Sequence, residues 1–454
     1  MTYINNREEK RNFYKLVFSL VLPMALQNLI NVGVSSADVI MLGKVGETSL
    51  SAASLAGQVQ FIMTLIFFGL TSGAAVLTAQ YWGKKDIRTI EKILAIAMRF
   101  ALIVSIIFTM AVLLFPRPIM KIFTSEEAVI TEGIQYLKIV GISYIFVAIT
   151  MIYLNIMRSV ERVIISTVVY LISLIINVIL NAVFIFGLFG LEPMGIRGAA
   201  LATLIARITE FIIVWFYARK VNKVLKFHIK DLFHKENVLM KDFFTFAIPV
   251  MLNELIWGAG TSTNAAIIGH LGSSVVAANS VTQVTRQLAM VVAFGLANAT
   301  AIIIGKAIGE QKEELAKVYA KRFIRLTLLL GFIGAGVILG VSSIAQSQLT
   351  LSTEARGYLK VMMFVMSYFA IGQAYNTTMV VGVFRAGGDT KFGLILDVST
   401  LWGCSIFFGA LAAFVWKLPV PIVYMIIMSD EIIKIPLTTL RYKSYKWVRN
   451  VTRG

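Results

Sequence analysis

The sequence predicts an all-α polytopic membrane protein whose twelve transmembrane helices fall into two halves of six. Of its 454 residues, 58% are hydrophobic and 15% are charged, whereas soluble domains carry about 45–50% apolar and about 25% charged residues. The apolar residues come in long blocks, and the second half of the chain repeats the first. Helices satisfy every backbone polar group inside lipid, and these blocks lack the alternation of β-barrel strands.

Twelve blocks are long enough to span a bilayer, which takes about 20 mostly apolar residues. The first contains Pro23 and the seventh Pro249, each of which removes one helical hydrogen bond. The last is the weakest, because Asp430, Glu431 and Lys434 interrupt it. In chain order the blocks cover residues 16–42, 50–82, 94–115, 134–156, 163–187, 198–218, 244–268, 275–304, 324–346, 358–384, 392–416 and 420–440.

The first block recurs 226 residues later without a gap. The two stretches read FSLVLPMALQNLINVGVSSADVIMLGKVG, ending at Gly46, and FTFAIPVMLNELIWGAGTSTNAAIIGHLG, ending at Gly272. Because each half has an even number of spans, the repeat is parallel and its pseudo-two-fold axis runs along the membrane normal. We expect an N-terminal lobe over residues 1–220, a cytoplasmic linker over 221–241 and a C-terminal lobe over 242–454.

The net charge of +18 is concentrated in alternate loops. Lys and Arg gather before the first span, after each even-numbered span and in the C-terminal tail. By the positive-inside rule, both termini and these loops are cytoplasmic. The basic residues are therefore topology signals, which argues against binding to nucleic acid. We expect a multi-pass protein of a bacterial-type cell membrane, in contact with the lipid bilayer.

Asp38 stands alone within the first apolar block. A carboxylate near mid-span costs about 2.5–3.5 kcal/mol on insertion scales, so such residues usually serve a function. Gln27 and Asn31 share its helical face, and this polar stripe needs a cavity or polar partners. An ionisable group in a two-half protein points to a carrier; the alternative is an Asp buried for helix packing. The candidate partners in spans five and six are Asn177, Asn181 and Thr203.

The chain as a whole resembles the multidrug and toxic compound extrusion (MATE) family. Three features carry the resemblance: Pro23 followed fifteen residues later by Asp38, the strings NVILNAVFIFG and GIRGAALAT in spans five and six, and FRAGGDTKF after span ten. The resemblance implies two six-helix bundles with a central cleft. It also implies multidrug efflux by secondary active antiport, in which organic cations or amphipathic xenobiotics leave in exchange for protons or sodium ions.

The resemblance assigns Asp38 and its partners to ion coupling, and it implies bending of the first span at Pro23, with Pro249 at the matching place. Many members carry Asp where this chain has Asn181. One carboxylate fewer weakens a sodium site and favours protons, since burial disfavours the charged form of a carboxylate. Either ion, or both, remains open. If sodium is used, the expected ligands are the oxygens of Asp38, Asn177, Asn181 and Thr203.

The second half departs from the family pattern. A glutamate that many members carry eight residues after the proline is Trp257 here, and an acidic residue of span ten is Ala374. Glu254 and Asp397, near Glu431, are the candidates to replace that site; ion pairs that close the bundle are the alternative. We expect the substrate cleft to include Gln27, Asn31 and Trp257, because broad binders use adaptable apolar surfaces with few polar anchors.

The sequence leaves three rival functions to consider. A flippase for a lipid-linked sugar is the nearest, with Arg99, Arg158 and Arg207 as candidates for buried positive charge. A channel would conduct continuously, where a carrier exchanges stoichiometrically. An enzyme is not expected, because there is no Walker A string and none of the three His residues pairs with Cys or a carboxylate at metal-binding spacing. We expect no cofactor besides the coupling ion, and a monomer whose cleft lies within one chain.

Overall fold

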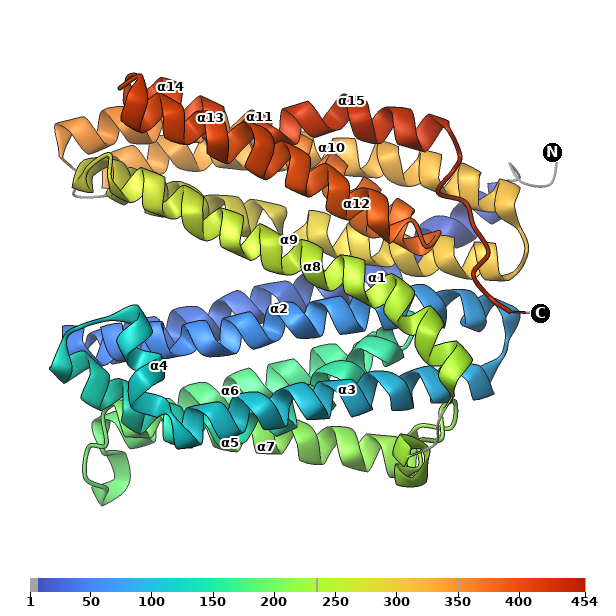
Figure 1. Cartoon of the computed structure of the whole chain (residues 1–454), viewed down its shortest axis with the longest axis horizontal. Helices are drawn as coiled ribbons and strands as arrows, with labels where there is room; N and C mark the ends of the chain where they lie inside the picture. The colour runs from blue at the N-terminus through green and yellow to red at the C-terminus, as the bar shows by residue number, and fades with distance from the viewer. Residues whose placement is uncertain (1–6, 234–235, 349–351, 454) are drawn as a thin grey trace. The chain divides into compact units, whose positions relative to one another are not determined.

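The computed structural model describes residues 7–233, 236–348 and 352–453 (Figure 1). Within these ranges the chain is helical and contains no strand. The first six residues, part of the predicted cytoplasmic N-terminus, and residues 234–235 of the predicted linker lie outside the described residues.

The first half contains one helix for each of its six predicted spans. A short extra helix, α4, was not predicted; it begins at Pro116, whose fixed φ suits a first helical turn. The last helix continues into a π-helical turn, Tyr217–Val221. The bounds are α1 Arg7–Gly43, α2 Glu47–Lys84, α3 Ile87–Leu114, α4 Pro116–Phe123, α5 Glu127–Ser159, α6 Ile164–Phe186 and α7 Ile196–Phe216.

The second half is more irregular. Its first helices are α8 Asn237–Gly269, α9 Ser273–Gly309, α10 Glu313–Gln348 and α11 Thr353–Thr377, which continues as the π-helical η5 Thr378–Phe384. The eleventh span changes form along its length, as α12 Thr390–Asp397, η6 Val398–Ile406, α13 Phe407–Ala410 and η7 Leu411–Val415. The twelfth block is two helices, α14 Val420–Ile427 and α15 Asp430–Lys443, because Met428 (φ −95°, ψ 19°) leaves helical geometry.

Ten helices of the described chain are long and apolar enough to cross a membrane. They correspond to the first nine predicted spans and to the eleventh. The other two predicted spans correspond to α11 with η5 and to the α14–α15 pair. The chain is therefore a multi-pass membrane protein by length and composition of its helices.

Contacts divide the chain into two compact units. Unit 1 comprises Met1–Ala25, Ala79–Lys85 and Ile248–Gly454; unit 2 comprises Leu26–Thr78 and Asp86–Ala247. Helix α1 therefore changes unit two residues after Pro23, and α8 changes unit close to Pro249. The predicted domain limits, with a linker over 221–241, stay a prediction.

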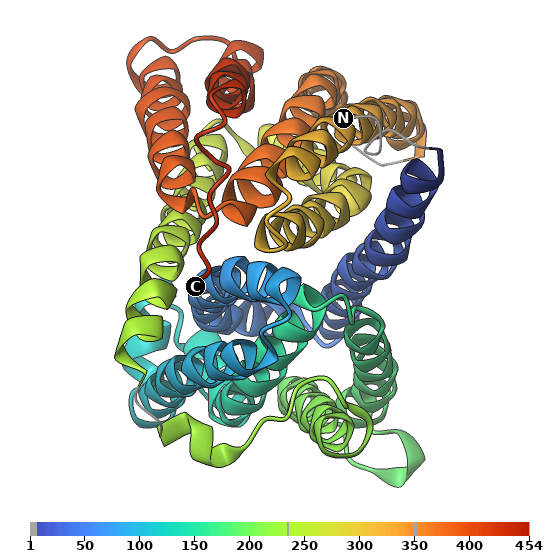
Figure 2. The ribbon, with the colours of Figure 1, turned by 90° about the vertical axis from the view of Figure 1, so that its right-hand side faces the viewer.

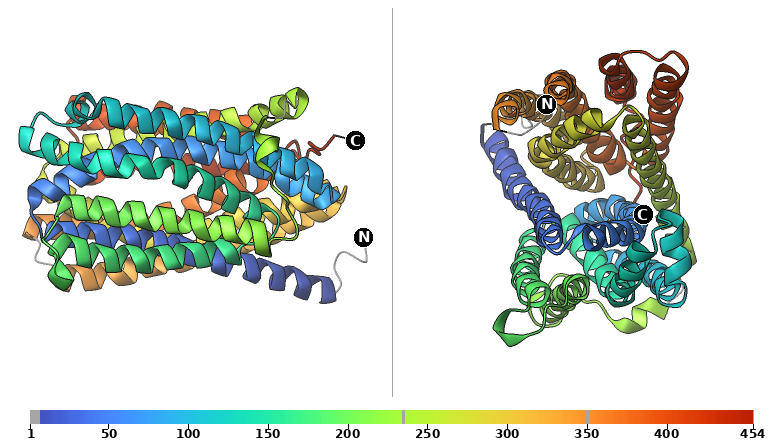
Figure 3. Two further views of the ribbon diagram at one scale, coloured as in Figure 1. Left: turned by 90° about the horizontal axis from the view of Figure 1, so that it is seen from below. Right: turned by 90° about the vertical axis from the view of Figure 1, so that its left-hand side faces the viewer.

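In unit 2, α5 packs against α3 and α7, and α6 packs against α7 (Figures 1 and 3). The contact between α6 and α7 is close at Gly198, where a Cβ would lie 2.6 Å from the carbonyl carbon of Phe184. Glycine at this position allows the two backbones to approach. The close approach brings the polar residues of α6 within reach of those of α7.

In unit 1, α9, α10 and α11 pack against one another, and α15 packs against α11 (Figure 2). The core of this unit contains Met362, Met363 and Met366 of α11 together with Tyr424 of α14, all at most 1% exposed. Helix α15 also carries three buried charged residues, Asp430, Glu431 and Lys434.

Candidate functional site

Unit 2 contains a cavity of about 290 Å³ around Asp38. Five helices contribute to its wall, so that a residue of the first span faces residues of the second, fourth, fifth and sixth. The wall mixes charged, amide and hydroxyl groups with a few apolar side chains. The lining residues are Val34, Ser35, Asp38, Gly57, Gln60, Phe61, Thr64, Tyr136, Ser173, Asn177, Thr203, Ala206 and Arg207.

A chain of hydrogen bonds connects the four residues predicted for the first-half site. Asn181 Nδ2 donates to Oδ1 of Asp38 at 2.5 Å and to Oδ1 of Asn177 at 3.1 Å. Asn177 Nδ2 in turn donates to Oγ1 of Thr203 at 3.5 Å. Asn177 and Asn181 are one turn apart on α6 and are both buried. The fold therefore brings the predicted residues into one network.

The direction of these hydrogen bonds bears on whether the network can bind a metal cation. A hard cation needs several oxygens that converge on one point. Here Asn181 turns its N–H groups toward Asp38 and Asn177, and its own Oδ1, which is buried, accepts no hydrogen bond from the described residues. An amide that donates to a carboxylate stabilises the carboxylate without providing an oxygen for a metal ion. In this arrangement the nitrogen of Asn181, and not its oxygen, lies against Asp38 and Asn177.

Arg207 was predicted only as a buried positive charge of the rival flippase, and Glu210 was not predicted. Arg207 lines the cavity, and its Nη1 donates to Oε1 of Glu210 at 2.6 Å. The Arg207 side chain is 24% exposed and that of Glu210 is 2% exposed. Arg207 also lies within electrostatic reach of Asp38. Opposite charges three residues apart inside the apolar block 198–218 were a signal that could have identified this pair.

The three residues predicted for the substrate cleft lie elsewhere. Gln27 is buried, and its Nε2 donates to Oγ1 of Thr167 at 2.8 Å and to Oγ of Ser166 at 3.0 Å. Asn31 and Trp257 are exposed, and none of the three is among the residues that line the cavity. Their predicted contact with substrate stays a prediction.

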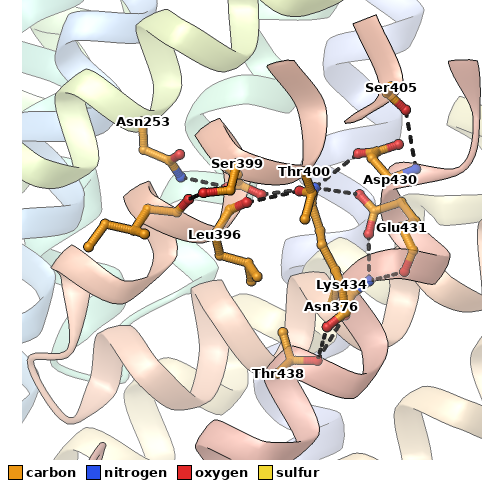
Figure 4. Close-up of polar contacts among 12 residues, drawn as sticks. Asn253, Asn376, Leu396, Ser399, Thr400, Ser405, Asp430, Glu431, Lys434 and Thr438 are labelled. Carbon is orange, nitrogen blue, oxygen red and sulfur yellow. Dashed lines mark hydrogen bonds and ion pairs between the residues drawn. The ribbon is translucent and has the colours of Figure 1, made fainter. Parts of the chain in front are cut away.

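Unit 1 contains a cluster of four charged residues, in which three carboxylates contact Lys434 (Figure 4). Lys434 Nζ lies 2.8 Å from Oδ1 of Asp397, 3.0 Å from Oδ2 of Asp430 and 3.3 Å from Oε1 of Glu431. The side chain of Lys434 is 4% exposed, and that of Asp397, the most exposed member, is 15% exposed. We call these four residues the Lys434 cluster. Two of the three predicted second-half residues, Asp397 and Glu431, thus meet at one ammonium group.

Two amide side chains donate hydrogen bonds to carboxylates of the Lys434 cluster. Asn253 Nδ2 donates to Oδ2 of Asp397 at 2.9 Å, and Asn376 Nδ2 donates to Oε2 of Glu431 at 2.8 Å (Figure 4). The buried Oδ1 of Asn253 accepts no hydrogen bond in the described chain. Asn253 occupies the repeat position of Gln27. Both halves therefore place a buried amide four residues after the proline.

Glu254, the third predicted residue of the second half, forms a separate ion pair. Arg385 Nη2 donates to Oε1 of Glu254 at 2.9 Å, and the Glu254 side chain is 22% exposed. Among the described residues, no three His, Cys, Asp or Glu side chains are arranged to hold a metal ion. Glu254 thus pairs with Arg385, whereas Asp397, Asp430 and Glu431 share the single ammonium group of Lys434.

Comparison with known proteins links this chain to one family. The family model MatE matches residues 23–183 and 249–411, one stretch in each half. The uncharacterised transporter YisQ of Bacillus subtilis is 21% identical over 436 residues, 95% of each chain. The probable multidrug resistance protein NorM of Rhizobium meliloti is 25% identical over 395 residues, 86% of this chain and 84% of that one.

Solved structures share the fold. A MOP superfamily transporter from Pyrococcus furiosus superimposes with a TM-score of 0.85 at 18% identity, covering 95% of this chain and 96% of that one. A multidrug resistance MATE family transporter in an outward-facing conformation gives a TM-score of 0.84 at 19% identity, with the same coverage. The likeness confirms the predicted fold class, an all-α polytopic membrane protein with twelve transmembrane helices in two six-helix bundles.

Proposed function

The chain belongs to the MatE family, and from this premise we propose that it is a secondary active antiporter that exports small organic molecules by alternating access. The substrates are organic cations or amphipathic compounds, and the driving force is the inward flow of protons, sodium ions or both. Because relatives that match across the chain are named as transporters, an enzymatic activity is not proposed. Export of such compounds is drug efflux in the broad sense.

The observation that carries this proposal is the cavity around Asp38. A titratable carboxylate inside a membrane-spanning helix lines a space of about 290 Å³ together with amide and hydroxyl groups. Intramembrane carboxylates that face a cavity mark ion and substrate pathways. In an antiport cycle, a proton and a cationic substrate compete for the same carboxylate, so that binding of one releases the other.

Protons are the coupling ion that we favour. Asn181 supplies a donor to Asp38 where a second carboxylate would supply an oxygen, and Arg207 adds positive charge nearby. Both features weaken the attraction of the site for a metal cation. A sodium ion held by oxygens of Asp38, Asn177, Asn181 and Thr203 is the alternative.

Pro23 and Pro249 are proposed as the bending points of the cycle. Helix α1 passes from one compact unit to the other two residues after Pro23, and α8 does so next to Pro249. A proline inside a helix removes a hydrogen bond and is a common point of bending. Bending there would change the relation between the units without disturbing the packing inside either.

A second ion-linked site in unit 1 is proposed at Asp397 and Glu431. Three carboxylates share Lys434, so the cluster carries two uncompensated negative charges when all three are ionised. Ionisable groups that gather inside a membrane-spanning lobe commonly mark ion and proton pathways. Glu254 is proposed in a lesser role, because its carboxylate is paired with Arg385.

Several further features complete the proposal. The substrate would contact Gln27, Asn31 and Trp257 in the cleft. The protein would work as a monomer in a bacterial-type cell membrane. Both of its termini would be cytoplasmic. The basic loops support this orientation, since Lys and Arg concentrate on the cytoplasmic side of membrane proteins.

Efflux from proteoliposomes tests the proposal. Vesicles are loaded with a fluorescent organic cation, and a proton gradient and a sodium gradient are imposed separately on wild type and on Asp38→Asn. We expect efflux under the proton gradient in wild type and its loss in the variant. Asp231→Asn, which changes a half-exposed carboxylate in the 3-10 helix η4 (Ile229–Phe233) before α8, is the matched control and should transport like wild type.

Each other outcome of the efflux assay would lead to a different conclusion about the coupling ion, the coupling residue or the function. Efflux only under the sodium gradient would identify sodium as the coupling ion. Gradient-driven efflux that persists in Asp38→Asn would move the coupling role to the Lys434 cluster. Absence of efflux under both gradients would contradict the antiporter and favour the alternative of a flippase for a lipid-linked sugar or another lipid.

A further inference from the structure

The cavity around Asp38 contains a second charged group, to which the proposed mechanism gives no part in binding the substrate. Arg207 lines the same wall as Asp38 and lies within electrostatic reach of it. A site for organic cations alone would gain nothing from a guanidinium group, which repels a cation in a low-dielectric cavity. The presence of Arg207 therefore calls for an explanation of its own.

Glu210 holds Arg207 in place but uses only part of its hydrogen-bonding capacity. One Arg207 nitrogen, Nη1, donates to Glu210 at 2.6 Å, and the described residues accept no other hydrogen bond from this side chain. A guanidinium group carries five N–H donors in a planar fork. Since Glu210 is 2% exposed and Arg207 is 24% exposed, the carboxylate supports the guanidinium from the protein side. The remaining donors have no hydrogen-bond acceptor among the described residues, and Arg207 is one of the residues that line the cavity.

We infer that the cavity is a two-charge subsite for small zwitterions, in which the cationic group of the substrate binds Asp38 and its anionic group binds Arg207. A carboxylate or a similar planar oxyanion matches the guanidinium fork, because it can accept two parallel hydrogen bonds. The volume of about 290 Å³ is at the lower end of the range of about 300–1,000 Å³ for small-molecule pockets. It suits a compact molecule or the charged head of a larger one.

The uncharged wall supports the same assignment. Gln60, Thr64 and Ser173 line the cavity and can each donate and accept hydrogen bonds. Phe61 and Val34 supply apolar surface for a ring or an alkyl group. The inference rests on the proposed function, since the proton that displaces the cationic group at Asp38 is the coupling ion of the antiporter.

Equilibrium binding to the purified full-length protein tests this subsite without any gradient. Three probes share one naphthalene ring system. The first, a zwitterion, carries an aminomethyl and a carboxymethyl group. The second is its methyl ester, a cation, and the third is the acid without the amine, an anion. We expect wild type to bind the zwitterion about tenfold or more tightly than either of the others, a difference of one decade in dissociation constant.

The variants test recognition of the cationic group and of the anionic group of the probe separately. Arg207→Gln combined with Glu210→Gln avoids leaving a buried carboxylate unpaired, and should lower the affinity for the zwitterion to that for the ester. Arg207→Lys keeps the charge but loses the fork, and should give an intermediate preference. Asp38→Asn should weaken binding of the zwitterion and the ester while the acid is unaffected. Arg197→Gln, an exposed change on the same helix, is the matched control.

Two results would overturn the subsite: equal binding of zwitterion and ester by wild type, or a preference that survives in the Arg207 and Glu210 double variant. Gradient-driven efflux of the same probes tests the proposed function separately. A binding preference without efflux would contradict the antiporter and leave the subsite standing, whereas efflux without preference would contradict the subsite alone.

Discussion

Asn181 donates a hydrogen bond of 2.5 Å from Nδ2 to Oδ1 of Asp38 across 143 positions of sequence. The contact joins the first and fifth predicted spans. It puts an amide where a second carboxylate would form a pair of like charges. The site therefore carries one titratable group at this contact, and we propose that residue 181 helps to determine which ion the site prefers.

Asn181→Asp should make transport responsive to sodium. Two carboxylates at this separation repel each other, and a metal cation between them relieves the repulsion. We expect sodium-gradient-driven efflux in the variant at a rate several times that of wild type, measured in proteoliposomes at constant pH. Asn450→Asp adds a carboxylate to an exposed position of the C-terminal tail, outside the predicted spans, and should leave the ion dependence as it is. Unchanged ion dependence in Asn181→Asp would show that residue 181 does not select the ion.

Lys434→Met should destabilise the protein strongly. Its removal leaves three carboxylates without their common cation, and breaking a buried ion pair from one side costs about 3–5 kcal/mol. The measurement is thermal unfolding in detergent, where a clear fall of the melting temperature is expected. Lys443→Met, an exposed change on the same helix, should have little effect. Adding Glu431→Gln to Lys434→Met should recover part of the loss, and no recovery would contradict the charge argument.

Gly198→Ala should weaken the packing between α6 and α7. The added Cβ would lie 2.6 Å from the carbonyl carbon of Phe184, so the helices must separate. Overpacking of this kind costs about 1–3 kcal/mol. We expect a lower melting temperature and slower transport, because Asn177 and Thr203 lie on the two separated helices. At Gly336 a Cβ meets no atom within 4 Å, so Gly336→Ala is the control, and equal effects of both changes would contradict this account.

Pro23→Ala should slow transport without loss of stability. Alanine restores a helical hydrogen bond, so the helix becomes straighter and stiffer where α1 changes unit. The expected result is a several-fold lower efflux rate with a melting temperature at or above that of wild type. Pro249→Ala should act in the same direction. Pro436, inside α15 and within one unit, gives the control variant Pro436→Ala, and an equal loss of rate there would argue against a special role for the first two prolines.

Much of the fold could be predicted from the sequence because lipid imposes local rules. Long apolar blocks must be helices, and their positions were predicted well except at the twelfth block, where Asp430 and Glu431 start a new helix after Met428. The short helix α4 escaped prediction because eight residues carry too little periodicity. The partners of Asp38 were predictable for a similar reason, since few polar side chains occur in neighbouring spans and each must find another.

The charged partners were not predictable to the same degree. Glu254 and Asp397 have the same charge and both lie in apolar blocks, yet one pairs with Arg385 and the other with Lys434. Sequence spacing pointed to Lys434 only as a partner of its neighbours Asp430 and Glu431. The pairing with Asp397 depends on how α12 and α15 pack, which involves residues 37 positions apart.

The sequence by itself determined the spans, the repeat, the side on which basic loops lie and the isolation of Asp38, because each follows from the cost of placing polar groups in lipid. Only the tertiary structure decided that Asn181 presents its nitrogen to Asp38, that Arg207 shares the cavity with it, and that three carboxylates converge on Lys434. The physical reason is that the energy of a charge in a low-dielectric interior depends on distances of a few ångström, and these are set by the packing of helices distant in sequence.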